Sequence, residues 1–376
     1  MKIKLISLCA VVLFFSCGFT FPSELPTECM VSSSAQSAYL YDALSGRVFY
    51  EKNENVPRSI ASTTKIVTAI TAIEHCEALD EKFEIDSRAV GIEGSSIYLR
   101  KGEHLSMRDL LYGLMLRSGN DCACAIAYRV GGSIEEFANM MNALVNKIGV
   151  ENSHFTNPHG LDDENHFASS KDLAKITGYA LLNPVFKEIV STKNIKVESD
   201  DGYRYMTNKN RLLASLEGCV GVKTGYTRKA GRCLVSAVER NGMMLVCVVL
   251  NCGPMFEESA AMLNKICDLF KAVEILAPWQ YVADIPLNRG EAEFVQVFSK
   301  QGFSLPLTQE ECDNIHINVE VPQVLDAPVQ NEAEVGKVEI YYKNHLIFSE
   351  KVYTLREVDS RMLKDKVKQI IDRWGI

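Results

Sequence analysis

The sequence predicts a mixed α/β (α+β) fold, with an antiparallel sheet covered by helices, then a small all-β domain and a terminal amphipathic helix. Strand-like runs occur near the start of the chain and again after Gly218, and helical patterns lie between them. Beyond Pro278 the sequence consists of short alternating runs, which are typical of strands. The last sixteen residues carry an apolar stripe at helical spacing. We therefore expect one sheet built from distant segments, and a separate β domain after it.

The length of 376 residues exceeds one average domain, so we expect two folded domains. The predicted boundaries are 30–275 for the larger domain, 280–354 for the β domain and 357–376 for the terminal helix. The net charge is −8, and the chain has no basic block and no aromatic RNA-binding motif. This composition argues against nucleic acid as a partner.

The N-terminus predicts export from the cytoplasm. Two lysines precede an apolar run from Leu5 to Phe15, and small residues follow it, which predicts a secretory signal peptide over 1–18. The run is too short to span a membrane as a helix. Cys17 leaves open a cleavage of the lipoprotein type. We expect an extracytoplasmic protein.

The twelve cysteines are scattered through apolar segments, where most are expected to be small buried hydrophobic residues. Cys219 and Cys233 bracket a segment that contains a turn, and they are the pair to test first for a disulfide. Cys122 and Cys124 have no histidine or second cysteine pair nearby, and the chain has no H-E-x-x-H motif. We therefore expect no metal and no cofactor.

The first part of the larger domain is predicted as a hairpin followed by helices. The runs 38–41 and 47–51 have the composition of paired strands, and a helix is expected to begin at Ser62. Ser106 can cap a helix, and Ser133 with Glu136 forms a capping-box pattern. These signals predict helices over 106–117, 121–130 and 133–148.

After Gly218 the pattern is strand-like. Asn241 and Gly242 lie between two apolar runs, which is a strong hairpin signal. The expected strands are 220–223, 233–239 and 243–250, followed by a helix over 256–270. In the β domain we expect strands at 293–298, 315–321, 338–342 and 346–352.

Ser62 and Lys65 form an S-x-x-K motif in which a hydroxyl and an amine lie one helical turn apart. Ile66, Val67 and Ile70 should bury this helix. Burial in an apolar site disfavours the ammonium form, so Lys65 can act as a base near neutral pH. The N-terminus of the helix adds partial positive charge beside a developing oxyanion.

Two further motifs each occur once. Ser118-Gly119-Asn120 lies in a predicted loop between helices, and Lys223-Thr224-Gly225 lies at the end of a predicted strand. Alone, each motif is explained by a capped helix, a turn or a strand end. Together, in these element types, they resemble the three motifs of the active-site serine penicillin-recognising enzymes. The resemblance implies a serine β-lactamase/transpeptidase-like domain over 30–275.

Other stretches narrow the resemblance to the low-molecular-mass penicillin-binding proteins, the serine-type D-alanyl-D-alanine carboxypeptidases. They are 157–161, 208–213, 221–227 and 230–231, and the similarity covers roughly 35–275. Gly119 resembles these carboxypeptidases more than the class A β-lactamases, which usually carry Asp at that position. The chain also has no E-x-x-L-N deacylation motif.

The resemblance implies a role for each catalytic residue. Ser62 would attack the carbonyl between two D-alanines, and Lys65 would take its proton. Ser118 would relay a proton to the leaving amine, and Asn120 would hold the substrate amide. Which lysine acts as the base at which step stays open.

The resemblance also implies the substrate-binding residues. Lys223 and Thr224 would bind the terminal carboxylate, and Gly225 and Tyr226 complete the binding strand. The backbone N–H groups of Ser62 and Tyr226 would form the oxyanion hole. Relatives can supply a further cation after the last sheet strand, where this chain has the uncharged run 251–256 followed by two glutamates. Lys209 or Arg211 could take that place.

The implied substrate is the pentapeptide stem of peptidoglycan, with β-lactam antibiotics as covalent inhibitors. A serine β-lactamase and a catalytically slow penicillin-binding receptor or scaffold stay open as alternatives. The last sixteen residues hold five basic and two acidic side chains around the apolar stripe. We therefore expect the terminal helix to bind the outer face of the cytoplasmic membrane, the alternative being a helix packed on the β domain.

Overall fold

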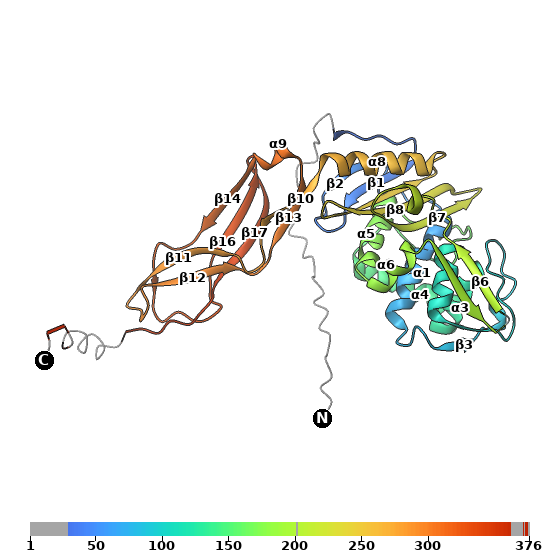
Figure 1. Cartoon of the computed structure of the whole chain (residues 1–376), viewed down its shortest axis with the longest axis horizontal. Helices are drawn as coiled ribbons and strands as arrows, with labels where there is room; N and C mark the ends of the chain where they lie inside the picture. Colours follow the sequence, from blue (N-terminus) through green and yellow to red (C-terminus); the bar gives the residue numbers. More distant parts are fainter. Residues whose placement is uncertain (1–28, 201, 362–370, 372, 375–376) are drawn as a thin grey trace, which may run out of the picture. The chain divides into compact units, whose positions relative to one another are not determined.

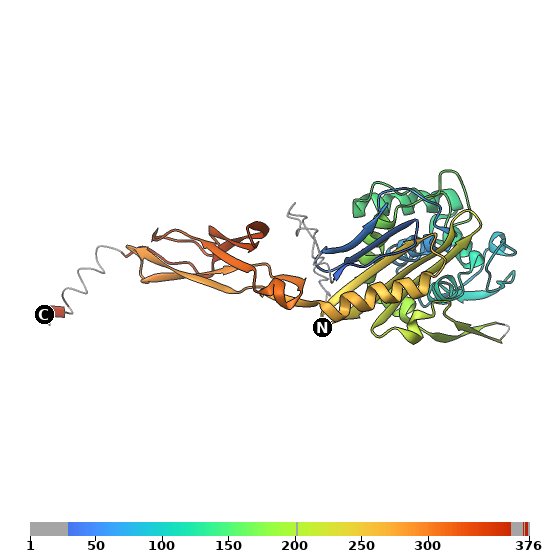
Figure 2. The ribbon, with the colours of Figure 1, turned by 90° about the horizontal axis from the view of Figure 1, so that it is seen from above.

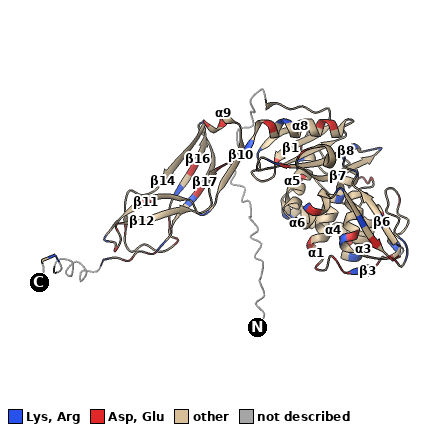
Figure 3. Ribbon diagram, viewed as in Figure 1, with Lys and Arg blue, Asp and Glu red and all other residues tan. Residues whose placement is uncertain are grey.

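The computed structural model describes residues 29–200, 202–361, 371, 373 and 374 (Figure 1). The predicted signal peptide, Cys17 and most of the predicted terminal helix lie outside the described residues. The chain divides into two compact units, and the division falls between Ala272 and Val273. The short segment Leu305–Thr308 belongs to the first unit. Basic and acidic residues are interspersed along the elements of both units (Figure 3).

The first unit is built around a five-stranded antiparallel sheet in the order β2-β1-β9-β8-β7. The early hairpin and the late strands therefore join in one sheet, as predicted. Asn241 and Gly242 both have positive φ, which is the geometry of the tight hairpin turn expected there. The strands are β1 (Ser37–Asp42), β2 (Val48–Lys52), β7 (Cys219–Thr227), β8 (Gly231–Arg240) and β9 (Met243–Leu250).

The sheet separates two hydrophobic cores. Val235 and Val248 point into a large core shared with the helices of the unit, and Leu234 and Val249 point into a smaller one. Helix α8 (Met255–Leu269) covers the smaller core and runs along that face of the sheet (Figure 2). This two-sided burial is why β9 is apolar along its whole length instead of alternating.

Two of the helices on the other face begin where their capping residues predict. Ser106 forms a complete capping box with Asp109, and Ser133 accepts from the backbone of Glu136. The predicted helices over 106–117, 121–130 and 133–148 are confirmed. The helices of this face are α1 (Lys65–His75), α2 (Met107–Leu116), α3 (Asn120–Gly131), α4 (Ile134–Ile148), α5 (Ser170–Leu181) and α6 (Pro184–Ser191). The short α7 (Leu212–Ser215) contributes Leu212 to the smaller core.

Two expectations for this unit need correction. Ser62 lies in a 3-10 turn, η2 (Ala61–Thr64), and the α-helix begins only at Lys65. Cys219 and Cys233 are both free. In the β7–β8 ladder Cys219 lies opposite Val238, five residues along β8 from Cys233, which is about 17 Å of strand and far beyond the reach of a disulfide.

The sequence analysis did not predict several elements of the first unit. Ser169 with Asp172 caps α5, and Asn183 followed by Pro184 starts α6, and both are helix-start signals that the sequence contains. Two hairpins were also missed. They are β3 (Lys82–Glu84) with β4 (His104–Ser106), and β5 (Asn194–Ser199) with β6 (Gly202–Thr207).

The second unit is a β domain with a six-stranded sheet in the order β14-β16-β17-β12-β11-β15. Val358 and Ser360 bridge to Val329 and Gly290, so the tail predicted as a helix from 357 begins as extended chain. Within the described residues, no helix has the length and apolar character needed to cross a membrane. The strands are β11 (Tyr281–Asn288), β12 (Phe294–Ser299), β14 (Ile315–Glu320), β15 (Leu325–Asp326), β16 (Glu334–Tyr342) and β17 (His345–Thr354), and β10 (Lys271–Leu276) pairs with β13 (Phe303–Leu307).

Candidate active site

The turn η2 presents the Ser62 hydroxyl at a partly exposed position between buried neighbours. Two threonine hydroxyls hold the turn: Thr63 Oγ1 donates to the carbonyl of Ile60 at 2.6 Å, and Thr64 Oγ1 donates to the carbonyl of Ala61 at 2.8 Å. Ala61 has a φ of +49°, a conformation that L-residues rarely adopt and that costs free energy. The fold therefore holds the backbone before Ser62 in an intrinsically unfavourable conformation.

Lys65 is fully buried, and its amine lies at the meeting point of three segments. Its Nζ donates to Ser62 Oγ at 2.9 Å, to Asn120 Oδ1 at 2.7 Å and to the carbonyl oxygen of His159 at 2.6 Å. Burial lowers the pKa of Lys65 from 10.5 to about 7. The structure thus brings together the predicted hydroxyl and amine, and the amine can exchange a proton with Ser62 near neutral pH.

Ser118 and Asn120 lie where α2 ends and α3 begins. Ser118 is buried with a φ of +64°, and Asn120 is the first residue of α3. Gly119 between them has no room for a side chain, because a Cβ there would lie 2.6 Å from Asp121 Oδ1 and 2.9 Å from Cys122 Sγ. The glycine that distinguishes this motif is therefore required by its packing.

A loop before α2, which the sequence analysis did not single out, orients Asn120. The Asn120 side chain donates from Nδ2 to the carbonyl of Glu93 at 2.6 Å, and its backbone N–H donates to the carbonyl of Ser95 at 2.6 Å. Asp121, also buried, accepts from the backbone N–H groups of Ile97 and Leu99. These bonds fix which way the amide of Asn120 faces, so that its oxygen meets Lys65.

The third motif lies on β7, an edge strand of the sheet that passes directly beside η2. A Cβ at Gly225 would lie 3.0 Å from the carbonyl oxygen of Ile60 and 3.2 Å from the backbone nitrogen of Ser62. A side chain at this position would push the strand away from Ser62. The glycine therefore allows the close approach of β7 to Ser62, while the Tyr226 side chain next to it is 66% exposed.

Lys223 is 1% exposed, and its Nζ donates to the carbonyl of Thr224 at 2.9 Å. Burial holds the pKa of Lys223 well below its ordinary value, and the positive charges of Lys65 and Lys209 lower that pKa further. A negative group that entered the site would be attracted to all three amines and would restore the charged form of Lys223.

Of the two cations left open by the sequence, Lys209 is the one whose charge acts on Lys223. Its Nζ donates to Ser95 Oγ at 3.1 Å, in the same loop that holds Asn120. Arg211 instead lies over the ring of Phe256, with its Cζ 5.3 Å from the ring centroid.

Two histidines support the site without taking part as charged groups. Burial lowers the pKa of His159 to about 3 and that of His166 to about 4, so both are neutral at neutral pH. Nδ1 of His166 accepts from the backbone N–H of Thr156, so Nε2 carries the proton that it donates to Thr64 Oγ1 at 2.7 Å. The ring nitrogens of His159 and His166 thus hold the surrounding loops by hydrogen bonds. Among the described residues, no cluster of three or more histidine, cysteine, aspartate or glutamate side chains is suited to hold a metal ion.

Taken together, the partly exposed Ser62 hydroxyl, the adjacent amine with a pKa of about 7 and the glycine-bearing strand beside them form an arrangement that suits nucleophilic catalysis by a serine. The family comparison agrees. The chain belongs to the D-alanyl-D-alanine carboxypeptidase family, peptidase S11, whose family model matches residues 24–253. The model for the C-terminal domain of penicillin-binding protein 5 matches residues 270–360.

Individual relatives cover most of the chain. D-alanyl-D-alanine carboxypeptidase DacF of Bacillus subtilis is 29% identical over 316 residues, which is 81% of both chains. DacA of Escherichia coli is 28% identical over 360 residues, covering 90% of this chain and 88% of the relative. The crystal structure of penicillin binding protein 5 from Haemophilus influenzae superposes with a TM-score of 0.76 at 25% identity, covering 88% of this chain and 99% of the other.

Proposed function

We propose that this protein removes the terminal D-alanine from the pentapeptide stems of peptidoglycan, as a serine D-alanyl-D-alanine carboxypeptidase. The observation that carries the proposal is the buried Lys65 amine, with a pKa of about 7, at 2.9 Å from the Ser62 hydroxyl in a chain of this family. This pair supplies a nucleophile together with a base that is partly unprotonated at physiological pH.

In the proposed reaction Ser62 Oγ forms a bond to the carbonyl carbon between the two D-alanines, and Lys65 accepts the hydroxyl proton. The bond from that carbon to the amide nitrogen then breaks, and a proton passes through Ser118 to the leaving D-alanine. Asn120 holds the substrate amide with the side chain that Glu93 orients. Water finally hydrolyses the ester on Ser62 and frees the shortened stem.

The residues of β7 in the proposed site bind the terminal carboxylate of the substrate. Lys223 and Thr224 bind it, and the charge of Lys209 adds attraction. The backbone N–H groups of Ser62 and Tyr226 receive the developing oxyanion, and the loss of one such donor typically costs about 100- to 1,000-fold in rate. The close approach at Gly225 supports this role for the two backbone groups.

The test compares two peptides and a labelled penicillin. The purified protein should release D-alanine from a peptide ending in D-alanyl-D-alanine, and leave a peptide ending in L-alanine intact, because the reversed stereocentre misplaces the scissile carbonyl. Penicillin should label Ser62, and Ser62→Ala should abolish both labelling and D-alanine release. Rapid penicillin turnover would instead identify a β-lactamase, and labelling without D-alanine release would identify a receptor.

We further propose that a signal peptide over 1–18 directs export, and that the basic tail binds the outer face of the cytoplasmic membrane. Support comes from the five basic and two acidic residues of the last sixteen, and from Trp374, whose side chain is 77% exposed. The test is a deletion of the tail, which should begin at residue 362 because Val358 and Ser360 pair with the β domain. The shortened protein should no longer bind anionic vesicles, and its turnover of a soluble peptide should be unchanged. Equal vesicle binding with and without the tail would contradict the proposal.

A further inference from the structure

The hairpin β5–β6 has one face packed on the core and one face open to solvent. Val197 and Met206 of the inner face belong to the large core. The outer face, which we call the hairpin face, consists of six exposed side chains that alternate with the inner ones: Asn194, Lys196, Glu198, Tyr203, Tyr205 and Thr207. The alternation shows that the fold holds these six side chains outward together.

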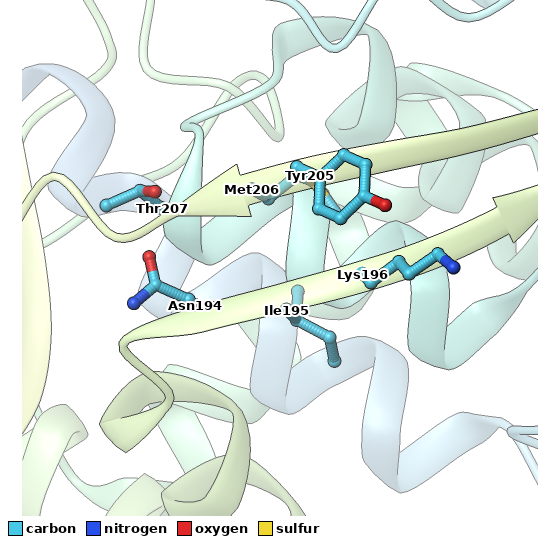
Figure 4. Close-up of a pocket in the computed structure, with 6 residues that line it drawn as sticks. All are labelled: Asn194, Ile195, Lys196, Tyr205, Met206 and Thr207. Atoms are coloured by element: carbon cyan, nitrogen blue, oxygen red, sulfur yellow. The ribbon is translucent and has the colours of Figure 1, made fainter.

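The hairpin face is rich in exposed aromatic surface. Tyr203 is 55% exposed and Tyr205 is 77% exposed, although tyrosine rings usually bury much of their area in a folded chain. The Lys196 amine lies 3.4 Å from the centroid of the Tyr203 ring and 5.9 Å from that of Tyr205. A hollow of about 410 Å³ lies at the open end of the hairpin, and residues of both faces line it: Asn194, Ile195, Lys196, Tyr205, Met206 and Thr207 (Figure 4).

The hairpin is fastened to the loop that shapes the active site. Arg204, on the inner face, pairs with the buried Glu103 and donates to the carbonyl oxygens of Ile97 and Tyr98, each at 3.1 Å. The neighbouring backbone of that loop is held by Asp121, next to Asn120. The hairpin face is therefore held in place relative to the catalytic residues.

The length of the chain gives an upper limit on how far the hairpin face lies from the site. Three residues lie between Tyr205 and Lys209, whose charge acts on Lys223, so the backbones of Tyr205 and Lys209 are at most about 14 Å apart. An extended pentapeptide spans about 17 Å. A stem bound beside Lys209 is therefore at least as long as the distance from Lys209 to Tyr205, which allows the sugar that carries it to lie near the hairpin.

We propose that the hairpin face binds the glycan strand of peptidoglycan while the stem occupies the active site, an inference that rests on the function proposed above. The face carries one positive and one negative side chain, Lys196 and Glu198, so it offers no net charge to an acidic peptide. It offers aromatic rings for the apolar faces of hexosamine rings, with an amide and hydroxyls for their polar groups. This chemistry fits an uncharged, acetamido-bearing saccharide.

The test compares a soluble pentapeptide with insoluble polymeric peptidoglycan. Tyr205→Ala should lower D-alanine release from the polymer by about 3- to 10-fold and weaken co-sedimentation with it to a similar degree, because one aromatic contact is lost. The same variant should process the soluble peptide at the wild-type rate. Tyr205→Phe should keep most of the polymer activity, and an N-acetylglucosamine tetramer should inhibit wild-type action on the polymer only.

A matched control is Tyr281→Ala, which removes an exposed tyrosine of the β domain. This variant should release D-alanine from both substrates at the wild-type rate. If Tyr205→Ala lowered the rate of D-alanine release equally on both substrates, the hairpin would instead support the catalytic residues. If Tyr205→Ala co-sedimented with the polymer as the wild-type protein does, the proposed glycan site would be overturned. These outcomes are separate from the proposed function, since failure of the wild-type protein to release D-alanine from the soluble peptide would overturn the activity alone.

Discussion

The helix α1 that begins at Lys65 and the strand β7 that carries Lys223 bury their lysines almost equally, at 0% and 1% exposed, but surround them differently. The Lys65 amine meets oxygens of Ser62, Asn120 and His159, whereas among the described residues Lys223 donates to one carbonyl of its own strand. An ammonium has three donors. Burial therefore lowers both pKa values, while the partners direct Lys65 to a hydroxyl and leave Lys223 able to bind a substrate anion.

The same substitution at both lysines should separate these roles. Lys65→Arg places a guanidinium that cannot lose its proton beside Ser62, and since general-base catalysis contributes about 100- to 10,000-fold, kcat/KM should fall by about that amount. Lys223→Arg keeps the charge and should lose much less, although the planar group fits the site poorly. Equal losses measured with a D-alanyl-D-alanine peptide would show that the two amines do the same work.

The pH dependence should report Lys65. Its pKa of about 7 means that the amine is charged at lower pH and cannot accept a proton, so kcat/KM should rise with pH through about 7. At pH 5 the rate should be about 100-fold below its plateau. Because His159 and His166 have pKa values of about 3 and 4, neither explains a limb near 7. If kcat/KM instead rose with pH through about 4, the ionisation of a histidine and not that of Lys65 would control the activity.

Lys223→Ala should cost about one to two decades in kcat/KM, because it removes a charge-assisted contact worth about 1.5–3 kcal/mol. The sharper measurement adds a substrate whose terminal carboxylate is amidated. Wild-type and variant proteins should process that substrate at similar, low rates, since the contact no longer exists in either. A loss in the variant that persists with the amide would mean that Lys223 acts on the reaction and not on the carboxylate.

The smallest effect should come from Gly225→Ala. The added methyl would lie 3.0 Å from the Ile60 carbonyl and must displace β7 by a few tenths of an ångström, which should lower kcat/KM by about tenfold. Gly253→Ala is the matched control, because a Cβ there has no neighbour within 4 Å among the described residues. If both variants kept full activity, the spacing between strand and turn would not limit the reaction.

Local patterns were sufficient to predict most elements of the first unit and the three motifs. The capping residues at Ser106 and Ser133 and the turn at Asn241 act through neighbours in the sequence, so their effects can be read without the fold. The apolar run 243–250 likewise indicated a strand, although its central place in the sheet could not be read from the run alone.

What could not be predicted depends on contacts between distant segments. The carbonyl of Glu93 that orients Asn120, and that of His159 that accepts from Lys65, are backbone groups with no signature in residue type. The start of α1 at Lys65 has a local cause, the 3-10 turn that directly precedes it. The pair Cys219 and Cys233, named as the first to test for a disulfide, is not bonded, because sheet register, which neither cysteine reveals, separates them along the ladder.

The position of β7 at the edge of its sheet has a consequence for solubility. An exposed edge strand offers unpaired backbone groups to any other extended chain, and proteins commonly cover such edges to avoid aggregation. Here Gly225 lies against the turn that carries Ser62, and Gly221, further back along the strand, lies against Val190 of α6. The turn η2 and helix α6 thus cover part of this edge and shield it from another copy of the sheet. A substitution that moved either element away from β7 would expose the edge and favour self-association.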